Sequence, residues 1–352
     1  MPKEKMTPKE RWLCVLKGEI PDRVPMDYWG TKEVTEKLMK YFGCNDEISL
    51  YKKLHIDKAF QVSPKYIGPP LKEGEDFYGC RYKKVNYGTG IYKECIYYPL
   101  AKYNSIEEIE KNYTWPSPDW FDYSVVKEQI RGKEEYPICG GGSEPFLIYK
   151  NLRGQEQAYI DLIENPELVH YCLDKLYNFC YEFTLRIYEQ IPFKITYSYV
   201  AEDMGSQEDL LFSIKHIREF FIPRMKKMIE LIHQQGAYVF FHSDGAIRKI
   251  IPDMIEIGID ILNPIQWRCK GMDRKELKKE FGKKVTFHGA VDNQKTLPFG
   301  SKEDVKKEVI ENIEILGKGG GYILAPCHNI QPITPIENII TMYEVGYECG
   351  WY

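Results

Sequence analysis

The sequence has little net charge and no long apolar run, and each absence excludes a class of protein. Its 352 residues include 48 basic and 52 acidic side chains, and the net charge of −4 predicts no basic surface for nucleic acid. The apolar runs are far shorter than the roughly 18 residues that a membrane-spanning helix needs. The first dozen residues, MPKEKMTPKERW, are charged, which predicts no secretion signal. We therefore expect a cytoplasmic protein with no nucleic-acid or membrane partner.

Paired cysteines, repeats and phosphate-binding loops are also lacking. The ten cysteines are scattered and none forms a Cys-x-x-Cys pair, so we expect mostly buried, reduced thiols. The Gly-rich segment 317–321 lacks the GxxxxGK[ST] pattern and is interpreted as a turn. With 43% hydrophobic residues, the chain can bury a large core. We expect a single domain over residues 1–352.

The second half of the chain alternates between strand-like and helix-like segments. The strand-like segments are rich in β-branched and aromatic residues. The predicted strands are 195–200, 237–241, 259–263, 284–287 and 322–325, and the predicted helices are 213–235, 246–257, 273–281, 301–316 and 335–348. Such alternation with short connections predicts a parallel sheet. We predict an α/β fold, a closed (β/α)8 TIM barrel, with an open doubly wound sheet as the alternative.

The first half is less regular but can supply the remaining strands. Segments 23–28, 56–62 and 136–139 are predicted as strands, and residues 152–190 as two helices. Segment 80–99 alternates like a hairpin with a Gly-rich turn at Gly88–Gly90. We interpret this hairpin as an insertion over the barrel mouth.

Polar and titratable residues gather directly after the predicted strands. In a parallel barrel these positions face one shared mouth, where the active site lies. The residues are Glu202 and Asp203, His242 and Asp244, Asn263, His288, and Cys327 and His328. Turn-forming residues alone would account for Asn, Asp and Ser at strand ends, but not for three histidines. We therefore expect the active site at this mouth.

A metal site is one interpretation of this group. His242 and Asp244 lie two residues apart, on the same side of an extended segment. With Cys327 they would supply three ligands and leave one open position, as in a catalytic zinc site. Asp244 could instead cap the following helix, and Cys327 could be a buried thiol. Glu202 could also complete the ligand set.

The other strand-end residues admit two interpretations each. Glu202 and Asp203 are adjacent, so one could reach the mouth as a base or substrate anchor while the other accepts structural hydrogen bonds. His288 could orient a substrate or bind backbone carbonyls. Gly140–Gly142 could let the backbone approach a ligand closely, or form a turn.

Four segments resemble the uroporphyrinogen decarboxylase-like superfamily, which includes cobamide-dependent methyltransferases. They are TPKERWLCVLKGEIPDRVPMDYW (7–29), EDMGSQEDLLFS (202–213), HSDG (242–245) and APCHNIQPITPIENI (325–339). They occur in the family's order and span nearly the whole chain. The resemblance implies a (β/α)8 barrel.

The resemblance leaves the activity open between two branches. Decarboxylases of the family carry an Arg-rich N-terminal loop that grips the tetrapyrrole propionates, whereas Tyr28–Thr31 contains no arginine. Arg23 and Arg153 are the few cations expected near the mouth. Methyltransferases of the family show His-x-Cys after one strand and a cysteine near the last. Here Asp244 replaces the first cysteine, and His328 fills the second position, with Cys327 one residue earlier.

The resemblance favours a methyltransferase that moves a methyl group from a small donor, such as a methoxylated aromatic, to a corrinoid. No DxHxxG corrinoid motif is present, so a partner protein would carry the corrinoid. The assigned roles are zinc ligands for His242, Asp244 and Cys327, catalysis for Glu202, Asp203 and His328, and substrate binding for Tyr28, Asn263 and His288. The alternatives are a metal-independent decarboxylase of a tetrapyrrole or other carboxylated substrate, built around His328 and Asp203, and a non-enzymatic barrel that binds a ligand or a corrinoid protein.

Overall fold

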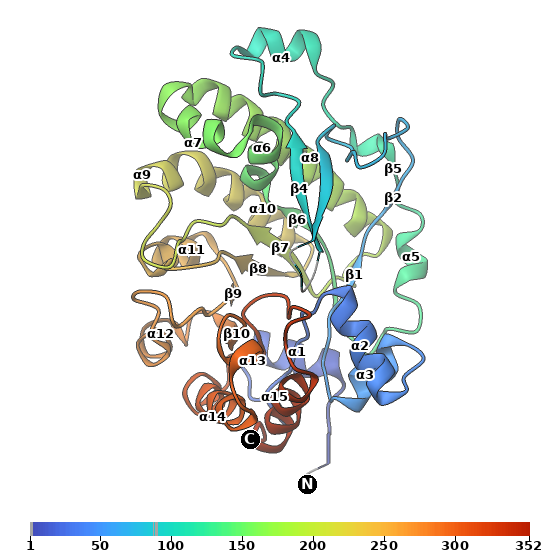
Figure 1. Ribbon diagram of the computed structural model, residues 1–352, viewed down its shortest axis with the longest axis vertical. Coiled ribbons are helices and arrows are strands. Elements are labelled where there is room, and N and C mark those ends of the chain that lie inside the picture. Colours follow the sequence, from blue (N-terminus) through green and yellow to red (C-terminus); the bar gives the residue numbers. More distant parts are fainter. Residues whose placement is uncertain (1–2, 87, 89–90) are drawn as a thin grey trace.

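A parallel sheet curled into a barrel forms the centre of the molecule, with helices around it (Figure 1). The computed structural model describes residues 3–86, 88 and 91–352. Neighbouring strands in the sheet are, in order, β1 (Phe60–Val62), β6 (Ile138–Ser143), β7 (Tyr197–Ala201), β8 (Tyr238–His242), β9 (Ile261–Asn263), β10 (Thr286–Val291) and β11 (Tyr322–Pro326). All six pairings are parallel. The predicted closed (β/α)8 barrel is therefore confirmed over the doubly wound sheet.

The segment predicted as the first strand, 23–28, closes the barrel between β11 and β1. Met26 forms a parallel bridge with Leu324 of β11. On the other side, the Asp57 amide donates to the Met26 carbonyl oxygen at 2.6 Å. This segment occupies the eighth strand position through isolated bridges, without a continuous ladder.

Helices cover the outer face of the sheet and follow the predicted order. They are α8 (Pro166–Gln190), α10 (Ile222–Gln234), α11 (Ile251–Ile257), α12 (Arg274–Phe281), α14 (Lys302–Asn312) and α15 (Ile336–Cys349). Ser301 and Asp304 form the capping box expected from their spacing at the start of α14. The predicted helix 213–235 is interrupted: α9 (Ile214–His216) leads into a π-helical stretch, Ile217–Phe221, before α10. Pro223 has no amide hydrogen and its ring crowds the preceding turn, which favours this widening.

The first half contributes smaller elements around the mouth. They are α2 (Lys32–Phe42), α3 (Glu47–Lys53), α4 (Ile106–Asn112), α5 (Val126–Gln129), α6 (Pro145–Arg153) and α7 (Gln155–Glu164), together with α13 (Thr296–Phe299) from the second half. Short strands β2 (Lys65–Tyr66) and β5 (Phe121–Asp122) pair antiparallel. Helices α7 and α8 confirm the two helices predicted in 152–190, whereas α6 was not predicted.

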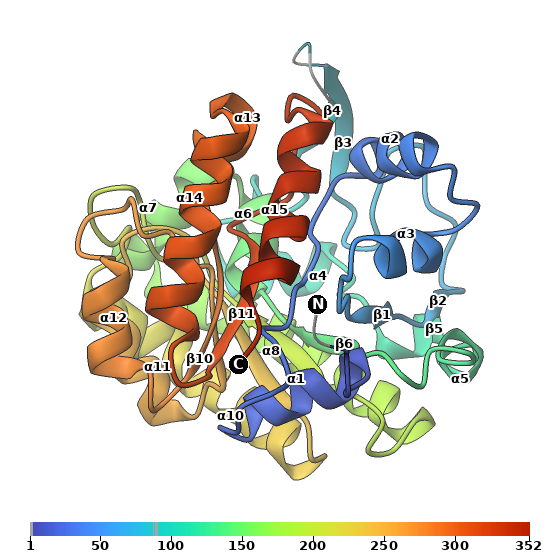
Figure 2. The same ribbon diagram turned by 90° about the horizontal axis from the view of Figure 1, so that it is seen from below.

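The predicted hairpin is present as β3 (Arg81–Asn86) and β4 (Ile91–Tyr97), paired antiparallel. Of its predicted turn Gly88–Gly90, residues 89 and 90 lie outside the described residues. In Figure 2 the hairpin projects from the end of the molecule where α13 lies, and α13 follows the carboxyl end of β10. The hairpin therefore stands on the mouth side of the barrel.

The opposite end of the barrel is covered by α1 (Pro8–Leu16) (Figure 2). Trp12 of this helix is fully buried, and its ring stacks on Tyr197 at the start of β7 with 5.3 Å between centroids. Trp12 packs with apolar side chains of the barrel interior, which include Phe240, Ile261 and Ile323. The barrel interior at this end is thus a packed core. None of the described helices combines the length and apolar character needed to cross a membrane.

Candidate active site at the barrel mouth

Three potential metal ligands meet at the carboxyl ends of β7 and β8. Atoms of Asp203, His242 and Asp244 that could bind a metal all lie within 4.8 Å of one another. His242 Nε2 is 3.6 Å from Asp203 Oδ1 and 4.0 Å from Asp244 Oδ1. The His242 side chain is 6% exposed, whereas the two carboxylates are 38% and 31% exposed. The group is therefore fixed on its histidine side and accessible on its carboxylate side.

Neighbouring groups orient both carboxylates. Gln266 Nε2 donates to Asp244 Oδ1 at 3.0 Å, and the Gln266 side-chain oxygen accepts from the Gly245 amide at 2.6 Å. The Asp244 amide donates to Asp203 Oδ1 at 3.3 Å. Burial, together with the Asp203 charge, raises the pKa of Asp244 against the opposing effects of His242 and His328. Two carboxylates this close to each other are stabilised by a cation between them.

A chain of buried polar side chains lies behind His242. His242 Nδ1 is 2.6 Å from Asn263 Oδ1, and Asn263 Nδ2 is 2.7 Å from His288 Nδ1. His288 Nε2 is 3.1 Å from Asp27 Oδ2. Asp27, Asn263 and His288 are each fully buried. The sequence predicts Asn263 and His288 as pocket-lining residues, but both are fully buried beneath the mouth. Asn263 contacts His242, and His288 contacts Asn263.

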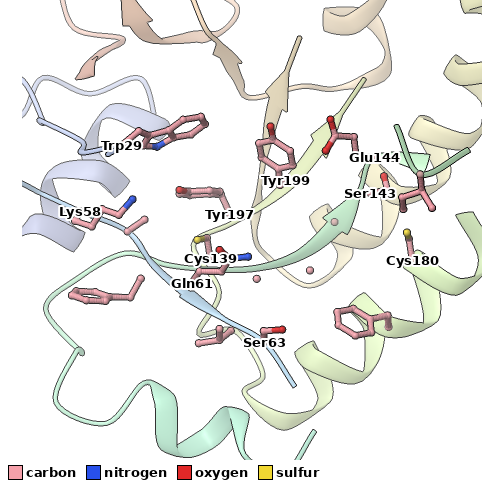
Figure 3. Close-up of a pocket in the computed structure, with 18 of the residues that line it drawn as sticks. Trp29, Lys58, Gln61, Ser63, Cys139, Ser143, Glu144, Cys180, Tyr197 and Tyr199 are labelled. Carbon is pink, nitrogen blue, oxygen red and sulfur yellow. The ribbon is translucent and has the colours of Figure 1, made fainter. Parts of the chain in front are cut away.

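A cavity of about 740 Å³ opens beside the three ligands, between β1, β6, β7 and α8 (Figure 3). Its walls are rich in aromatic rings: Trp29, Tyr51, Phe60, Phe77, Tyr78, Phe179, Phe183, Tyr197 and Tyr199. Tyr199 and Trp29 also flank His242, with ring centroids 5.5 and 6.1 Å from the imidazole. These shared walls make the cavity and the ligand group one site.

Charged groups are few along this cavity. Among the described lining residues Lys58 is the only cation, and Figure 3 shows it on the opposite side of the cavity from Glu144. Burial, and then the charges of Asp203 and Asp244, raise the pKa of Glu144 from 4.5 to about 7. Glu144 is not among the site residues predicted from the sequence, although it directly follows the end of β6 at Ser143.

Cys327 does not join the ligand group, which corrects its prediction as a metal ligand. Its Sγ lies 3.5 Å from the Ile265 carbonyl oxygen, and burial raises its pKa well above the usual value. His328, the next residue, is partly exposed and lies near enough to lower the pKa of Asp244. His328 thus lies near Asp244, whereas the Cys327 sulfur lies against the Ile265 carbonyl. Asp203 is the third residue of the potential ligand group instead.

Glu202 points away from the mouth, while Asp203 joins the ligands. Glu202 is 2% exposed, and its Oε1 accepts from the Phe146 amide in the first turn of α6 at 2.8 Å. Burial raises its pKa well above the usual value. Of the two interpretations that the sequence leaves open for this pair, Glu202 is therefore the structural acceptor, and its predicted catalytic role is not supported by its position.

Tyr28 also lies away from the cavity, contrary to its prediction as a substrate-binding residue. Its hydroxyl is 2.9 Å from Thr35 Oγ1, its ring packs against Tyr51 and Tyr343, and burial raises its pKa to about 12. The next residue, Trp29, lines the cavity in its place.

The two arginines expected near the mouth are held in buried ion pairs elsewhere. Arg23 binds Asp57 at 2.8 Å, and Arg153 binds Asp161 at 2.6 Å. Neither lines the cavity. The cations that a highly carboxylated substrate requires are therefore not supplied by these residues.

Comparison with known proteins identifies the family of this chain. The family model for uroporphyrinogen decarboxylase (URO-D) matches residues 123–348. A uroporphyrinogen decarboxylase of Prochlorococcus marinus (strain MIT 9215) is 32% identical over 215 residues, which cover 60% of this chain and 55% of that protein. Methylcobamide:CoM methyltransferase MtaA of Methanosarcina barkeri is 25% identical over 215 residues, covering 61% of this chain and 58% of MtaA.

A solved structure agrees over nearly the whole fold. A methyltransferase from Methanosarcina mazei superposes with a TM-score of 0.71 at 20% identity, covering 98% of this chain and 99% of the other. The curated relatives are matched over about half to three fifths of their own length. Decarboxylases and a methyltransferase, all enzymes, thus stand among the relatives. Since the family model covers more than half of the sequence, the chain belongs to the uroporphyrinogen decarboxylase (URO-D) family.

Proposed function

We propose that the protein is a zinc-dependent methyltransferase that moves a methyl group from a small aromatic donor to a corrinoid carried by a partner protein. The observation that carries this proposal is the group formed by Asp203, His242 and Asp244 at the barrel mouth. Three acceptor atoms converge there beside a cavity, and a metal ion held by them would keep a fourth position for a substrate. Three protein ligands with an open position are typical of a catalytic zinc site.

The three metal-binding side chains fit a divalent metal on chemical grounds. His242, Asp203 and Asp244 would hold it, and Gln266 would keep the Asp244 carboxylate oriented. When bound, such an ion acts as a Lewis acid that polarises the donor oxygen or nitrogen bearing the methyl group. One imidazole and two carboxylates form a harder set than thiolates, which suits this role better than ionising a thiol.

The cavity beside the ligands supports an aromatic donor. Its aromatic walls would sandwich a planar ring by stacking and edge contacts. Glu144 lies at the same end as Tyr199 and can hold a proton near neutral pH, because its pKa is about 7. That proton would go to the oxygen from which the methyl group departs.

The same cavity argues against uroporphyrinogen as the substrate. That tetrapyrrole carries four acetate and four propionate groups, which require several cations in the binding site. Lys58 is the single cation among the described lining residues, and Arg23 and Arg153 are engaged elsewhere. The corrinoid is assigned to a partner because the chain has no DxHxxG motif, and a related protein is named a methylcobamide methyltransferase.

The proposal is tested by metal content and by methyl transfer. We expect elemental analysis to find about one zinc ion per chain in the wild-type protein and none in His242→Ala. His216→Ala, a change on α9 outside the site, serves as the control and should keep the metal. Wild-type protein should methylate reduced cobalamin from a methoxylated aromatic compound, and His242→Ala should not. A metal-free protein that releases carbon dioxide from a carboxylated substrate would refute the proposal.

A further inference from the structure

We propose that Asn263, His288 and Asp27 are positioning residues that hold His242 in the one tautomer able to bind a metal through Nε2. This inference rests on the metal site of the proposed function and assigns it a supporting structure. The three residues come from β9, β10 and the segment that closes the barrel, so they reach His242 from across the interior. None of them contacts the ligand side of the imidazole.

The chemistry of the Asn263 amide fixes both imidazoles. Its oxygen only accepts hydrogen bonds, so His242 Nδ1, at 2.6 Å, must carry a proton and donate. Its nitrogen only donates, so His288 Nδ1, at 2.7 Å, must be unprotonated and accept. In a neutral ring one nitrogen carries the hydrogen, so the lone pair of His242 lies on Nε2. That lone pair faces Asp203 and Asp244.

Asp27 determines which way the Asn263 amide points. Because His288 Nδ1 accepts, His288 Nε2 carries the hydrogen and donates to Asp27 Oδ2 at 3.1 Å. If the amide were reversed, its oxygen would accept from His288 Nδ1. The lone pair of a neutral His288 would then lie on Nε2 and face the buried Asp27 carboxylate, unless His288 became doubly protonated. Burial opposes that charge and holds the pKa of His288 below its usual value. Asp27, which is 261 residues from His288 in the sequence, thus determines the orientation of the Asn263 amide.

Asp27 itself is held in place from several directions. Trp29 Nε1 donates to Asp27 Oδ2 at 2.9 Å, and the Tyr28 amide donates to Oδ1 at 2.8 Å. Lys58 Nζ lies 4.0 Å from Oδ1. Despite its burial, the Lys58 charge, the hydrogen bond from His288 and that from the Tyr28 amide keep the pKa of Asp27 below its usual value. A charged acceptor therefore anchors the end of the hydrogen-bonded row of side chains that is farthest from His242.

Metal-binding histidines commonly donate their other ring hydrogen to an oxygen, and losing that partner typically lowers metal affinity about 10–100-fold. Here the oxygen belongs to an amide whose orientation depends on a second histidine and a carboxylate. We therefore expect the affinity to depend on Asp27, although Asp27 lies outside the metal group.

The first measurement is the tautomeric state of the histidines in metal-free wild-type protein. Long-range proton–nitrogen NMR spectra at pH 8 should show His242 with hydrogen on Nδ1 and His288 with hydrogen on Nε2. His242→Ala identifies the His242 signals by their loss. Finding hydrogen on Nε2 of neutral His242 would overturn the proposal, and this test needs no variant of Asn263 or Asp27 to fold.

The second measurement is the affinity for Co²⁺, followed by its absorption spectrum. Asn263→Leu removes both hydrogen bonds of the Asn263 side-chain amide and should weaken Co²⁺ binding about 10–100-fold. Asn263→Asp keeps an acceptor for His242 Nδ1 and should restore most of the affinity, which a loss of packing alone would not explain. Asp27→Asn should weaken binding in the same direction. Asn338→Leu removes a buried asparagine that donates to Leu297 and Gly300, far from the site, and should leave the affinity unchanged.

The outcomes separate this inference from the proposed function. If wild-type protein binds neither Co²⁺ nor Zn²⁺, the proposed metal site fails, whatever the tautomers are. If wild-type protein binds Co²⁺ and folded Asn263→Leu binds it equally well, the positioning role fails while the metal site stands.

Discussion

The third potential ligand of the candidate metal site is an aspartate just after β7 rather than a cysteine after β11. Asp203 joins His242 and Asp244, whereas the Cys327 sulfur lies against the Ile265 carbonyl. We therefore expect Asp203→Asn to lower zinc affinity at least about tenfold, because a charged ligand becomes neutral. Cys327→Ser should keep the metal with wild-type affinity. Isothermal titration of both variants with zinc decides between the two ligand sets, and loss of binding in Cys327→Ser alone would reverse the assignment.

Glu144 predicts a pH dependence of stability in the metal-free protein. Its pKa is raised from 4.5 to about 7, so its contribution to stability is complete below pH 4.5 and is lost as the pH rises through about 7. A shift of this size corresponds to about 3 kcal/mol. Glu144→Gln should therefore gain stability relative to wild type between pH 5 and pH 8. Urea unfolding at both values measures this difference.

An exposed glutamate provides the comparison for that experiment. Glu164 ends α7 at the surface, and Glu164→Gln should follow the wild-type pH profile. A Glu144→Gln profile parallel to that of wild type would contradict the assigned pKa.

Which of two adjacent residues faces the mouth could not be predicted from the sequence. Every residue of β11 is buried, so the strand shows no alternation of polar and apolar residues. The sequence therefore identified the Cys327–His328 pair but not the side that each occupies. The Glu202–Asp203 pair left the same uncertainty. Trp29 was missed because the residue before it, Tyr28, was predicted to bind the substrate. Glu144 was missed because the interpretation of this region rested on the glycines Gly140–Gly142.

At the scale of elements, Gly142 allows β6 and β7 to pair. Its φ is +117°, and a Cβ atom there would lie 1.8 Å from the Tyr199 carbonyl oxygen. We expect Gly142→Ala to lower the free energy of unfolding by at least about 3 kcal/mol, since backbone strain adds to the clash. Gly132→Ala has a similar positive φ of +73° but meets nothing within 4 Å, and should cost about 1 kcal/mol. Equal losses in urea unfolding would show that strain, not close approach, dominates.

The strands of the second half were predictable to within about two residues, except that β10 continues to Val291 where the sequence predicted an end at 287, and those of the first half were predicted less well. Helices that end at glycine divide residues 195–352 into clear units, as at Gly236 and Gly258. By contrast, the first strand position makes only isolated bridges, and α6 begins at Pro145, where the sequence predicted no helix. Tertiary pairing, which a local pattern does not encode, decides such segments.

At the scale of the whole molecule, a buried charge network fastens the closing segment to the barrel. Asp57 binds Arg11 at 2.6 Å and Arg23 at 2.8 Å, and all three side chains are at most 1% exposed. Asp57→Asn would leave two buried arginines without their shared partner, so we expect a loss of about 3–5 kcal/mol in the free energy of unfolding. Asp253→Asn, which breaks the surface pair with Arg218, should cost at most about 1 kcal/mol. A loss as small in Asp57→Asn would mean that this network does not stabilise the closure.

The closing segment also sets an order of events during synthesis. Its Pro25 carbonyl and Asp27 amide bond to Leu324, near the other end of the chain, and Asp27 anchors the residues behind His242. A nascent chain can form strands and helices one after another as it leaves the ribosome. Its first strand, however, cannot pair with β11 until β11 has been synthesised. Any chain that stops before residue 324 lacks the partner of that first strand. Such a chain would therefore also lack the contact that places Asp27 behind His242.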